Sequence, residues 1–520
     1  MSDEPRRRTE GGGGRRSLRR EHAGGFRRAL GLTALGTLLP GAGLTRTRRK
    51  VWGWLLLTIS VALLGLVVAG LGTRGPRRFG LDVITNSATL TLVVAVFLIG
   101  GVVWCASIIA TAVLARPRML DRSRTRALAI FTTIMVILVG GAAFKGSEYA
   151  LITKETIVEV FSGGDLKSGE AAVVVEGEDP WADTPRVNIV LLGSDAGVGR
   201  IGTRTDSMVV ASVDTKSGRT VLISLPRNLE RVPLPQSSKL RDIWPSGIYG
   251  VPTCPRQRIN ASDRCMLNAI WTEVDDYRAS NPDAYPGVAA PGRSEIRGVI
   301  AEIVGLKINH MVVIDLKGFQ QLIDAMGGVD VNIKLAGPDG NQPLPYGKDY
   351  GNGRYSDYFT KPGVQHLSGY EALWYARTRA ADGDSQRQSR QRCVIKAVLD
   401  QVRPSVMITK YPQLARIARD NIYTDVAADA LPAFAELVER IQQSSIDSLG
   451  FTSADGFNPS RPDYGRLREL VKDAIESPPV PSATRSTPTT NAPTSAPTTA
   501  LPEATPGMSA PAAPSQDECA

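Results

Sequence analysis

Residues 188–214 read NIVLLGSDAGVGRIGTRTDSMVVASVD and contain two apolar strands separated by a glycine-rich loop. Asp195 closes the first strand and Asp206 opens the second, so a hairpin would bring both carboxylates together beside Arg204. Two close carboxylates repel each other unless a divalent cation neutralises them. We therefore predict a metal site at this end of the hairpin.

So small a set of hard oxygen ligands favours Mg²⁺ (or Mn²⁺), which keeps waters and takes its other ligands from phosphate. A turn or capping role would explain one such aspartate alone, but two that face each other favour the metal. The three histidines, at positions 22, 310 and 366, are scattered and do not support zinc. GSDAGVGRIG lacks the lysine-serine ending of a Walker loop, and GSDAG is not the GxSxG elbow of a hydrolase.

A second feature is a cluster of arginines within sixteen residues: Arg377, Arg379, Arg387, Arg390 and Arg392. The ordinary explanation of such a charge run is a solvated helix face. However, two of them are three residues apart on one helical face, and the only acidic neighbours are Asp382 and Asp384. We expect guanidiniums without carboxylate partners to bind an external anion, and bidentate geometry favours phosphate or pyrophosphate.

The net charge of +10 is concentrated at the N-terminus. Residues 1–50 hold thirteen Lys/Arg and four Asp/Glu, which accounts for +9, and the remaining 470 residues are close to neutral. A basic nucleic-acid-binding face on a globular domain is therefore not expected. A basic segment before apolar runs is typical of a positive-inside membrane anchor, with a disordered nucleic-acid-binding arm as the alternative.

Apolar runs occupy residues 29–44, 51–72, 87–115 and 127–144. A spanning helix needs about 20 residues, so we predict three transmembrane helices within residues 51–149. The first run is short and contains Pro40, so we expect an interfacial or re-entrant stretch, with residues 1–50 in the cytoplasm. Three crossings of the cell membrane then place everything after residue 150 outside. Nothing resembles a cleavable signal peptide.

After a linker or stalk at residues 150–184, residues 185–476 have the pattern of a mixed α/β domain. Strands are predicted at 187–193, 208–214, 220–226, 311–316 and 329–333, with helical patterns between and after them. Arg227 follows the third of these strands and either joins the arginine cluster or is an ordinary strand-end residue. Residues 338–364, rich in Gly, Pro, Asn and Tyr, are predicted to form a long loop that could act as a lid.

Residues 477–520 consist largely of Pro, Ser, Thr and Ala. Such a tail cannot bury enough surface to offset chain entropy, so we predict that it is disordered, either as a spacer in the cell wall or as an inert tail. Cys254 and Cys265 flank the loop CPRQRINASDRC, and we predict a disulfide between them. Cys393 is either buried or a rival partner for one of them, and Cys519 is a candidate free thiol.

These segments resemble the LytR-CpsA-Psr family in order and spacing. The resemblance runs from about 186 to 403, and more weakly to about 476, through NIVLLGSD, RTDSMVVASVD, LISLPRN, NHMVVIDLKGFQQLIDAMGGVDV, LSGYEALWYARTR and DSQRQSRQR. The membrane run and the Pro/Thr tail are similar to the actinobacterial type. The resemblance implies a three-layer α-β-α domain with a central mixed sheet and a hydrophobic pocket for a prenyl chain.

The resemblance also implies the site residues. The metal-binding positions match Asp195 and Asp206. The catalytic and phosphate-binding positions match Arg204, Arg227, Arg377, Arg379, Asp384, Arg387, Arg390 and Gln391. Two positions that are usually basic in the family are not basic in this chain. They are Gly197, for which Arg200 could substitute, and Met266.

The implied activity is that of a membrane-attached, Mg²⁺-dependent phosphotransferase. It would move a glycopolymer from a polyprenyl-pyrophosphate carrier to peptidoglycan, with an aspartate near the metal as candidate base. Two alternatives use the same site: a pyrophosphatase, and a non-catalytic polyprenyl-phosphate-binding module of the cell envelope, which the two departures favour. A transcription regulator would need a cytoplasmic DNA-binding domain, and residues 1–50 are too short and glycine-rich to form one.

Overall fold

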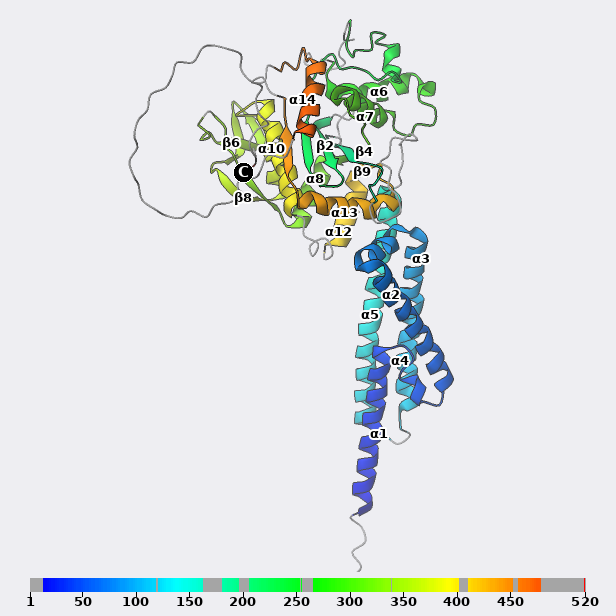
Figure 1. Ribbon diagram of the computed structural model, residues 1–520. Coiled ribbons are helices and arrows are strands. Elements are labelled where there is room, and N and C mark those ends of the chain that lie inside the picture. The colour runs from blue at the N-terminus through cyan, green and yellow to red at the C-terminus, as the bar shows by residue number, and fades with distance from the viewer. Residues whose placement is uncertain are drawn as a thin grey trace, which may run out of the picture. The chain divides into compact units, whose positions relative to one another are not determined.

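The computed structural model of the chain (Figure 1) divides into two compact units, Met1–Glu159 and Val160–Ala520. It describes residues 13–117, 120–161, 180–195, 205–252, 254, 265–337, 339–401, 410–451, 457–477 and 519. Arg204 and most of the predicted stalk and tail lie outside these ranges. Their predicted roles, including the disorder of the tail, therefore stay predictions.

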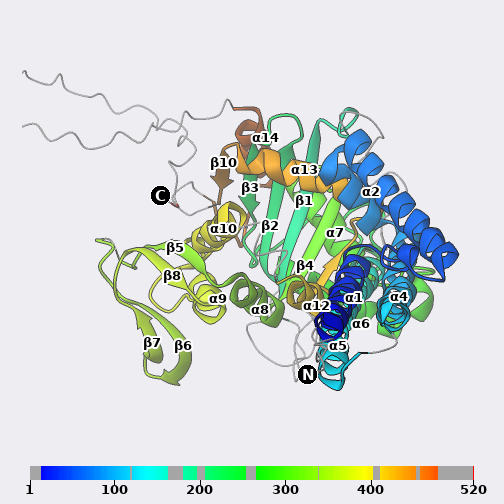
Figure 2. The same cartoon turned by 90° about the horizontal axis from the view of Figure 1, so that it is seen from below.

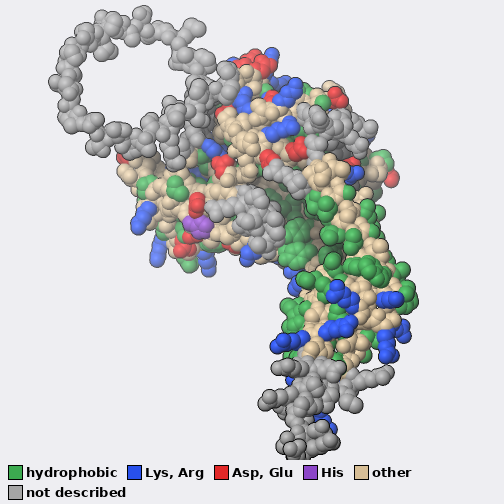
Figure 3. Space-filling view, turned by 60° about the horizontal axis from the view of Figure 1, so that its bottom comes forward, with side chains coloured by type: hydrophobic (Ala, Val, Ile, Leu, Met, Phe, Trp, Pro, Cys, Tyr) green, Lys and Arg blue, Asp and Glu red, His purple; other side chains and the backbone are tan. Residues whose placement is uncertain are grey.

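The first unit is helical. Its elements are α1 (Gly13–Leu38), η1 (Leu44–Arg46), α2 (Lys50–Thr85), α3 (Ser87–Ala95), η2 (Val96–Gly100), α4 (Gly101–Ala115) and α5 (Arg122–Val160). Three segments are long and apolar enough to cross a membrane: Lys50–Gly75, Ser87–Ala115 and Arg122–Val160. They coincide with the three predicted spans, and α5 continues into the first residues of the predicted stalk. Hydrophobic side chains cover much of the visible surface of this unit, with Lys and Arg toward one end (Figure 3).

α1 lies beside α4, and the chain then turns back. Trp104 on α4 donates a hydrogen bond from its indole nitrogen to the Gly36 carbonyl at 2.9 Å. After the turn, the backbone of Gly43 approaches the same helix so closely that an added Cβ would lie 2.7 Å from Thr111. Gly36 and Gly43, on either side of the turn, therefore both lie against α4. The position of this segment in a membrane stays a prediction.

The second unit is built on a six-stranded mixed sheet. In the order β10-β3-β2-β1-β4-β9, its strands are β10 (Ile446–Leu449), β3 (Thr220–Ser224), β2 (Thr205–Asp214), β1 (Arg186–Ser194), β4 (His310–Asp315) and β9 (Ile422–Thr424). Figure 2 shows β10, β3, β2, β1 and β4 side by side in this order. β1 is parallel to β4 and antiparallel to β2, which is antiparallel to β3. The ends of β1, β3 and β4 and the start of β2 therefore share one edge.

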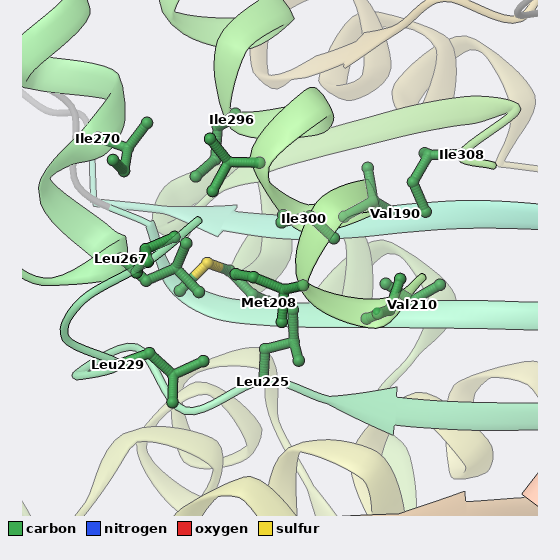
Figure 4. Packing of buried hydrophobic residues seen from close by; sticks show 14 of the residues in the cluster. Val190, Met208, Val210, Leu225, Leu229, Leu267, Ile270, Ile296, Ile300 and Ile308 are labelled. Atoms are coloured by element: carbon green, nitrogen blue, oxygen red, sulfur yellow. The ribbon is translucent and has the colours of Figure 1, made fainter. Parts of the chain in front are cut away.

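Helices cover both faces of this sheet, as the three-layer prediction requires. α6 (Ile270–Ser280), α7 (Pro291–Val304) and α14 (Tyr464–Glu476) pack on one face, and α10 (Asp384–Gln401) and α13 (Leu431–Gln442) pack on the other. Successive strand residues point to opposite faces. Val190 and Val210 accordingly face Ile300 of α7 (Figure 4), whereas Val213 packs against Leu437 of α13.

A smaller lobe adjoins the sheet through α10. Its elements are α8 (Leu316–Met326), β5 (Val329–Ile333), β6 (Leu344–Gly351), β7 (Arg354–Phe359), β8 (Gly363–Leu367), α9 (Gly369–Arg377) and α12 (Tyr411–Asn421). β5 pairs with β8, and β6 pairs with β7. Val394 of α10 belongs to the core of this lobe, while the next residue, Ile395, packs against Val209 and Ala211 of the sheet. α10 is thus shared by both cores. The remaining short helices are η3 (Lys239–Asp242), η4 (Leu267–Ala269), η5 (Pro282–Ala284) and η6 (Ala428–Ala430).

The prediction of a long loop at residues 338–364 is wrong. β6 and β7 form an antiparallel hairpin in which Gly351 pairs with Arg354. The two turn residues, Asn352 and Gly353, have φ values of 52° and 73°. Positive φ at both central positions is the geometry of a type I′ turn, whose twist matches that of the flanking strands.

Two disulfides occur among the described cysteines. The Cys254–Cys265 bond confirms the predicted local pairing. The candidate free thiol, Cys519, is instead bonded to Cys393 on α10. Cys393 is therefore both buried and paired, and its partner comes from the end of the chain rather than from the local loop.

Candidate functional site

Four chain segments meet at the edge of the sheet that holds the ends of β1, β3 and β4. Asp195 follows β1 directly, Asp206 is the second residue of β2, and Arg227 lies just past β3. Ser194, the last residue of β1, pairs with Thr205 on one side and with the end of β4 on the other. Open α/β sheets commonly bind ligands at the carboxyl ends of their parallel strands.

A β-bulge determines how Asp206 is presented. Gly193 pairs with Ser207 and Ser194 pairs with Thr205, so Asp206 is the extra residue on its strand. A bulge re-aims the side chain of the unpaired residue and is common beside functional sites. Here the carboxylate of Asp206 forms a salt bridge with the guanidinium of Arg227. The two predicted functional residues are thereby in contact.

Asp195 is buried, and the loop that connects it to β2 lies outside the described residues. Within the described ranges, no group of three or more His, Cys, Asp or Glu side chains could hold a metal ion. Two carboxylates still suit Mg²⁺, because this ion usually takes one or two carboxylates and completes its shell with water and phosphate. The residues present fit the predicted metal, which stays a prediction.

The N-terminal half of α10 lies against the start of β2. Arg387, only 3% exposed, donates to the backbone carbonyl of Asp206 at 3.0 Å and forms a salt bridge with Asp384 at 2.9 Å. One turn later, the side-chain oxygen of Gln391 accepts a hydrogen bond from Ser207 at 3.1 Å. Three predicted site residues of α10 are therefore brought to the edge of the sheet, where Asp206 and Arg227 lie.

Electrostatic coupling joins these groups into one cluster. Burial is the largest cause that lowers the pKa of Arg387, and the nearby guanidiniums of Arg227 and Arg379 lower it further. The carboxylates of Asp384 and Asp206 oppose this shift. A cluster with three guanidiniums and two carboxylates has a net positive charge. Such a cluster attracts an anion.

Two further arginines extend from the end of α9. This helix begins with a capping box of Ser368 and Glu371 and ends at Arg377, whose guanidinium lies 5.6 Å from the ring centroid of Trp374. Arg379 is 3.8 Å from the carboxylate of Asp384, and its side chain is 48% exposed. These residues are more accessible than those of α10.

Arg390 is held entirely by neighbouring protein groups in the turn between α9 and α10. It is 5% exposed and donates to the backbone carbonyls of Tyr375 and Thr378. It also forms a two-pronged salt bridge with Asp382. These contacts fix the turn that carries Arg379, and a direct contact of Arg390 with substrate stays a prediction.

The expectation that the clustered arginines lack carboxylate partners is wrong. Carboxylates pair with Arg227, Arg379, Arg387 and Arg390. Sequence reasoning undercounted these partners because Asp206 lies far away in the chain and because one carboxylate, that of Asp384, contacts two guanidiniums. It also missed Thr378, whose hydroxyl donates to the Pro345 carbonyl at 2.6 Å. The only sequence signal for Thr378 is its position between two predicted site arginines.

Residues 158–461, more than half of the chain, match the model of the LytR_cpsA_psr family. The chain is 23% identical over 367 residues to the polyisoprenyl-teichoic acid–peptidoglycan teichoic acid transferase TagV of Bacillus subtilis, which covers 68% of this chain and 79% of the relative. It is 25% identical over 315 residues to the TagU transferase of Enterococcus faecalis, which covers 59% and 82%. The crystal structure of B. subtilis TagV has 23% identity and a TM-score of 0.37, covering 56% of this chain and 98% of that chain.

Proposed function

The chain belongs to the LytR-CpsA-Psr family, and from this premise we propose that it transfers a glycopolymer from a polyprenyl-pyrophosphate carrier to peptidoglycan. The product would be a phosphodiester link formed during cell-wall assembly. The names of the relatives support this, since they are transferases of teichoic acid between a polyisoprenyl carrier and peptidoglycan. The structural observation that carries the proposal is the meeting of Asp206, Arg227 and Arg387 at one edge of the sheet.

The arginines would bind the pyrophosphate. Arg227 and Arg379 are only partly buried and can turn guanidinium donors toward an incoming oxyanion. Their planar forks match phosphate oxygens in a bidentate manner. Arg387 is fixed from behind by Asp384, so its positive charge is already in place and requires little reorganisation. Arg204 and Arg377 are proposed to contribute to the same neutralisation.

Asp195 and Asp206 would hold a Mg²⁺ or Mn²⁺ ion, which when bound supplies charge neutralisation at the pyrophosphate. The chain's own groups perform the remaining tasks. They orient the carrier so that an acceptor sugar hydroxyl attacks the glycan-side phosphorus. The new O–P bond forms as the bond to polyprenyl phosphate breaks, and the hydroxyl proton passes to a base, for which an aspartate of this site is our candidate. Such catalysis consists mainly of positioning and charge stabilisation.

The helical unit supports a multi-pass location in the cell membrane with the second unit outside. Its three apolar segments are long enough to span, and its Arg-rich segments, residues 46–50 and 116–126, would lie on the cytoplasmic side. A lipid-linked carrier stays in the bilayer. Anchoring the enzyme there keeps the site close to its substrate.

The proposal is tested with the full chain in liposomes, supplied with carrier-linked glycan, cell-wall fragments and Mg²⁺. Mass spectrometry should detect glycan joined to wall fragments by a phosphodiester, together with an equal amount of polyprenyl phosphate. Chelation by EDTA should stop the reaction, and added Mg²⁺ should restore it. Release of glycan phosphate at the same rate without wall fragments would identify a pyrophosphatase instead. Bound lipid without turnover would identify a binding module.

A further inference from the structure

A groove of about 750 Å³ opens beside the arginine cluster. The β6–β7 hairpin forms one wall with Lys348, Asp349 and Tyr355, and the end of α9 forms another with Trp374 and Arg377. Arg379 and Asp384 also line it. The groove is therefore continuous with the group of charges to which the pyrophosphate role is assigned.

Aromatic side chains form a row that leads from this groove along α9. Tyr370 and Trp374 are four residues apart on one helical face, with ring centroids 6.2 Å apart, and Tyr346 of the hairpin lies 6.4 Å from Tyr370. The residues of α9 that build the core are others, among them Ala372 and Tyr375. Tyr370 is 39% exposed. Tyr370 and Trp374 are therefore not among the residues that fill the core of the lobe, whereas Tyr346 packs against that core.

The chemistry of the lining distinguishes between the two halves of a lipid-linked glycan. A prenyl chain in this groove would remove water from Lys348, Asp349 and Arg377 without replacing their hydrogen bonds, which is costly. A sugar ring has the opposite character. Its C–H face suits the electron-rich face of Trp374 or Tyr355, and its hydroxyls can donate to carboxylates and accept from ammonium or guanidinium groups.

We propose that this groove binds the saccharide part of the substrates, and that Tyr355 and Trp374 are the platforms on which sugar rings stack. The inference rests on the transferase function proposed above and names the substrate portion that this part of the site recognises. A saccharide occurs both in the carrier-linked donor and in the wall acceptor. The groove would recognise the saccharide of the donor and that of the acceptor by the same chemistry. The experiment below separates these two sources.

The hairpin is fixed relative to the arginines, as a specificity-determining wall requires. Thr378, between Arg377 and Arg379, donates to the Pro345 carbonyl of β6 at 2.6 Å. Gly347 has φ of 82°, and a Cβ there would lie 2.1 Å from the hydroxyl oxygen of Ser356. The register shifts at Asp349, where the strand bulges. The hairpin therefore bends at the level of the groove.

Tyr355 is held in place by a cross-strand partner. It pairs with Asp349 in the hairpin register. Burial is the largest cause that raises the pKa of Tyr355, and the charge and hydrogen bond of Asp349 raise it further. Its hydroxyl therefore stays protonated and bonded to the carboxylate. This leaves the ring as the part of Tyr355 that can contact a ligand in the groove.

The test uses the full chain in liposomes and the variants Tyr355→Ala and Trp374→Ala. The Michaelis constant is measured twice, once for carrier-linked glycan at fixed wall fragments and once for wall fragments at fixed donor. We expect one of the two constants to rise about tenfold, because truncating a central aromatic contact typically costs more than 1 kcal/mol of binding energy. The constant that rises identifies the source of the sugar. Trp374→Phe should retain most of the affinity.

Binding of farnesyl pyrophosphate, a sugar-free probe, separates this inference from the proposed function. Tyr355→Ala should bind the probe as the wild type does. Tyr350→Ala, an exposed aromatic on the same hairpin that does not line the groove, is the matched control and should leave both constants unchanged. Unchanged constants in Tyr355→Ala and Trp374→Ala would overturn the inference, as would an equal loss of probe and glycan binding. Full activity of Asp206→Ala would instead overturn the proposed function.

Discussion

Two arginines of α10 and the two at and just past the end of α9 are all predicted site residues, but they differ in how the protein holds them. Arg387 and Arg390 are almost fully buried, and each combines a backbone carbonyl with a carboxylate. Arg379 is half exposed at the rim of the groove, with a single carboxylate 3.8 Å away. Arg377 lines the same groove beside the ring of Trp374.

This difference indicates a division of labour. Breaking a buried, hydrogen-bonded charge pair leaves an uncompensated charge inside the protein, so the α10 arginines stabilise the fold as well as the charge of the site. An exposed ion pair contributes little to stability. The arginines after α9 can therefore exchange their contacts for those of a substrate at little cost.

The largest expected effect comes from comparing a variant of a buried α10 arginine with a variant of the exposed arginine after α9. Arg390→Ala should lower transfer by about a hundredfold or more and the free energy of unfolding by about 3–5 kcal/mol, because Asp382 is left buried without its partner. Arg379→Ala should lower transfer while changing the unfolding free energy by less than about 1 kcal/mol. Transfer rates and thermal unfolding of the full chain measure both. Equal losses of unfolding free energy in Arg390→Ala and Arg379→Ala would contradict the distinction between buried and exposed arginines.

A second prediction concerns Asp206, which contacts both Arg227 and the α10 arginine Arg387. Asp206→Ala should reduce transfer by about a hundredfold or more, because it removes a metal ligand and the carboxylate that positions Arg227. The initial rate of phosphodiester formation is the measurement. Asp276→Ala, an exposed carboxylate on α6, serves as control and should keep the wild-type rate. A near-normal rate in Asp206→Ala would remove this residue from the site.

A smaller effect is expected at the link between the arginines after α9 and the hairpin. Thr378→Val removes the hydroxyl that donates to the buried Pro345 carbonyl. An unsatisfied buried acceptor costs about 1–3 kcal/mol, so the variant should be less stable and bind glycan several-fold more weakly. Thr378→Ser keeps the hydroxyl and should behave as the wild type. Equal behaviour of the Val and Ser variants would show that this bond does not position the hairpin.

The smallest effect is a pH dependence in the same lobe. The hydrogen bond that the imidazole of His366 donates to the Asp330 carboxylate is the largest cause that raises the pKa of His366, and the hydrogen bond to the Gly327 carbonyl raises it further. The folded state therefore binds the proton more tightly, so this stabilisation is complete below the unfolded pKa of about 6.5 and is lost as pH rises through the folded value. Because both side chains are more than half exposed, the contribution should be under about 1 kcal/mol. Unfolding of wild type and His366→Gln at pH 5.5 and 8 measures it, and an identical pH dependence of the two would contradict it.

The sequence predicted the parts of the fold that depend on local patterns. The β-rich apolar runs at 187–193 and 208–214 predicted β1 and β2, because strands that are covered by helices on both faces are apolar along most of their length. Ser368 and Glu371 have the spacing of a capping box, so the start of α9 can also be read from the sequence. Arg387 and Arg390, three residues apart, predicted the helical face of α10, which brings Asp384, Arg387 and Gln391 to the site.

What the sequence did not predict depends on pairing between distant segments. The bulge at Asp206 is a shift of register between two strands, and no single residue encodes it. Two of the carboxylate partners of the arginines likewise depend on folding, because Asp206 comes from another strand and Asp384 is shared by Arg379 and Arg387. The β6–β7 hairpin had a usable signal, because Asn352-Gly353 is a typical two-residue turn, but the glycine-rich surroundings favoured a loop.

The disulfide between Cys393 and Cys519 has a practical consequence for anyone labelling this protein. A fluorophore attached close to Cys519 would report from the surroundings of α10, because the disulfide holds that residue there. Mild reductant would release it, so the same label would give different signals in buffers with and without thiols. Probes that should report independently of the redox conditions belong elsewhere, for instance on the β6–β7 turn.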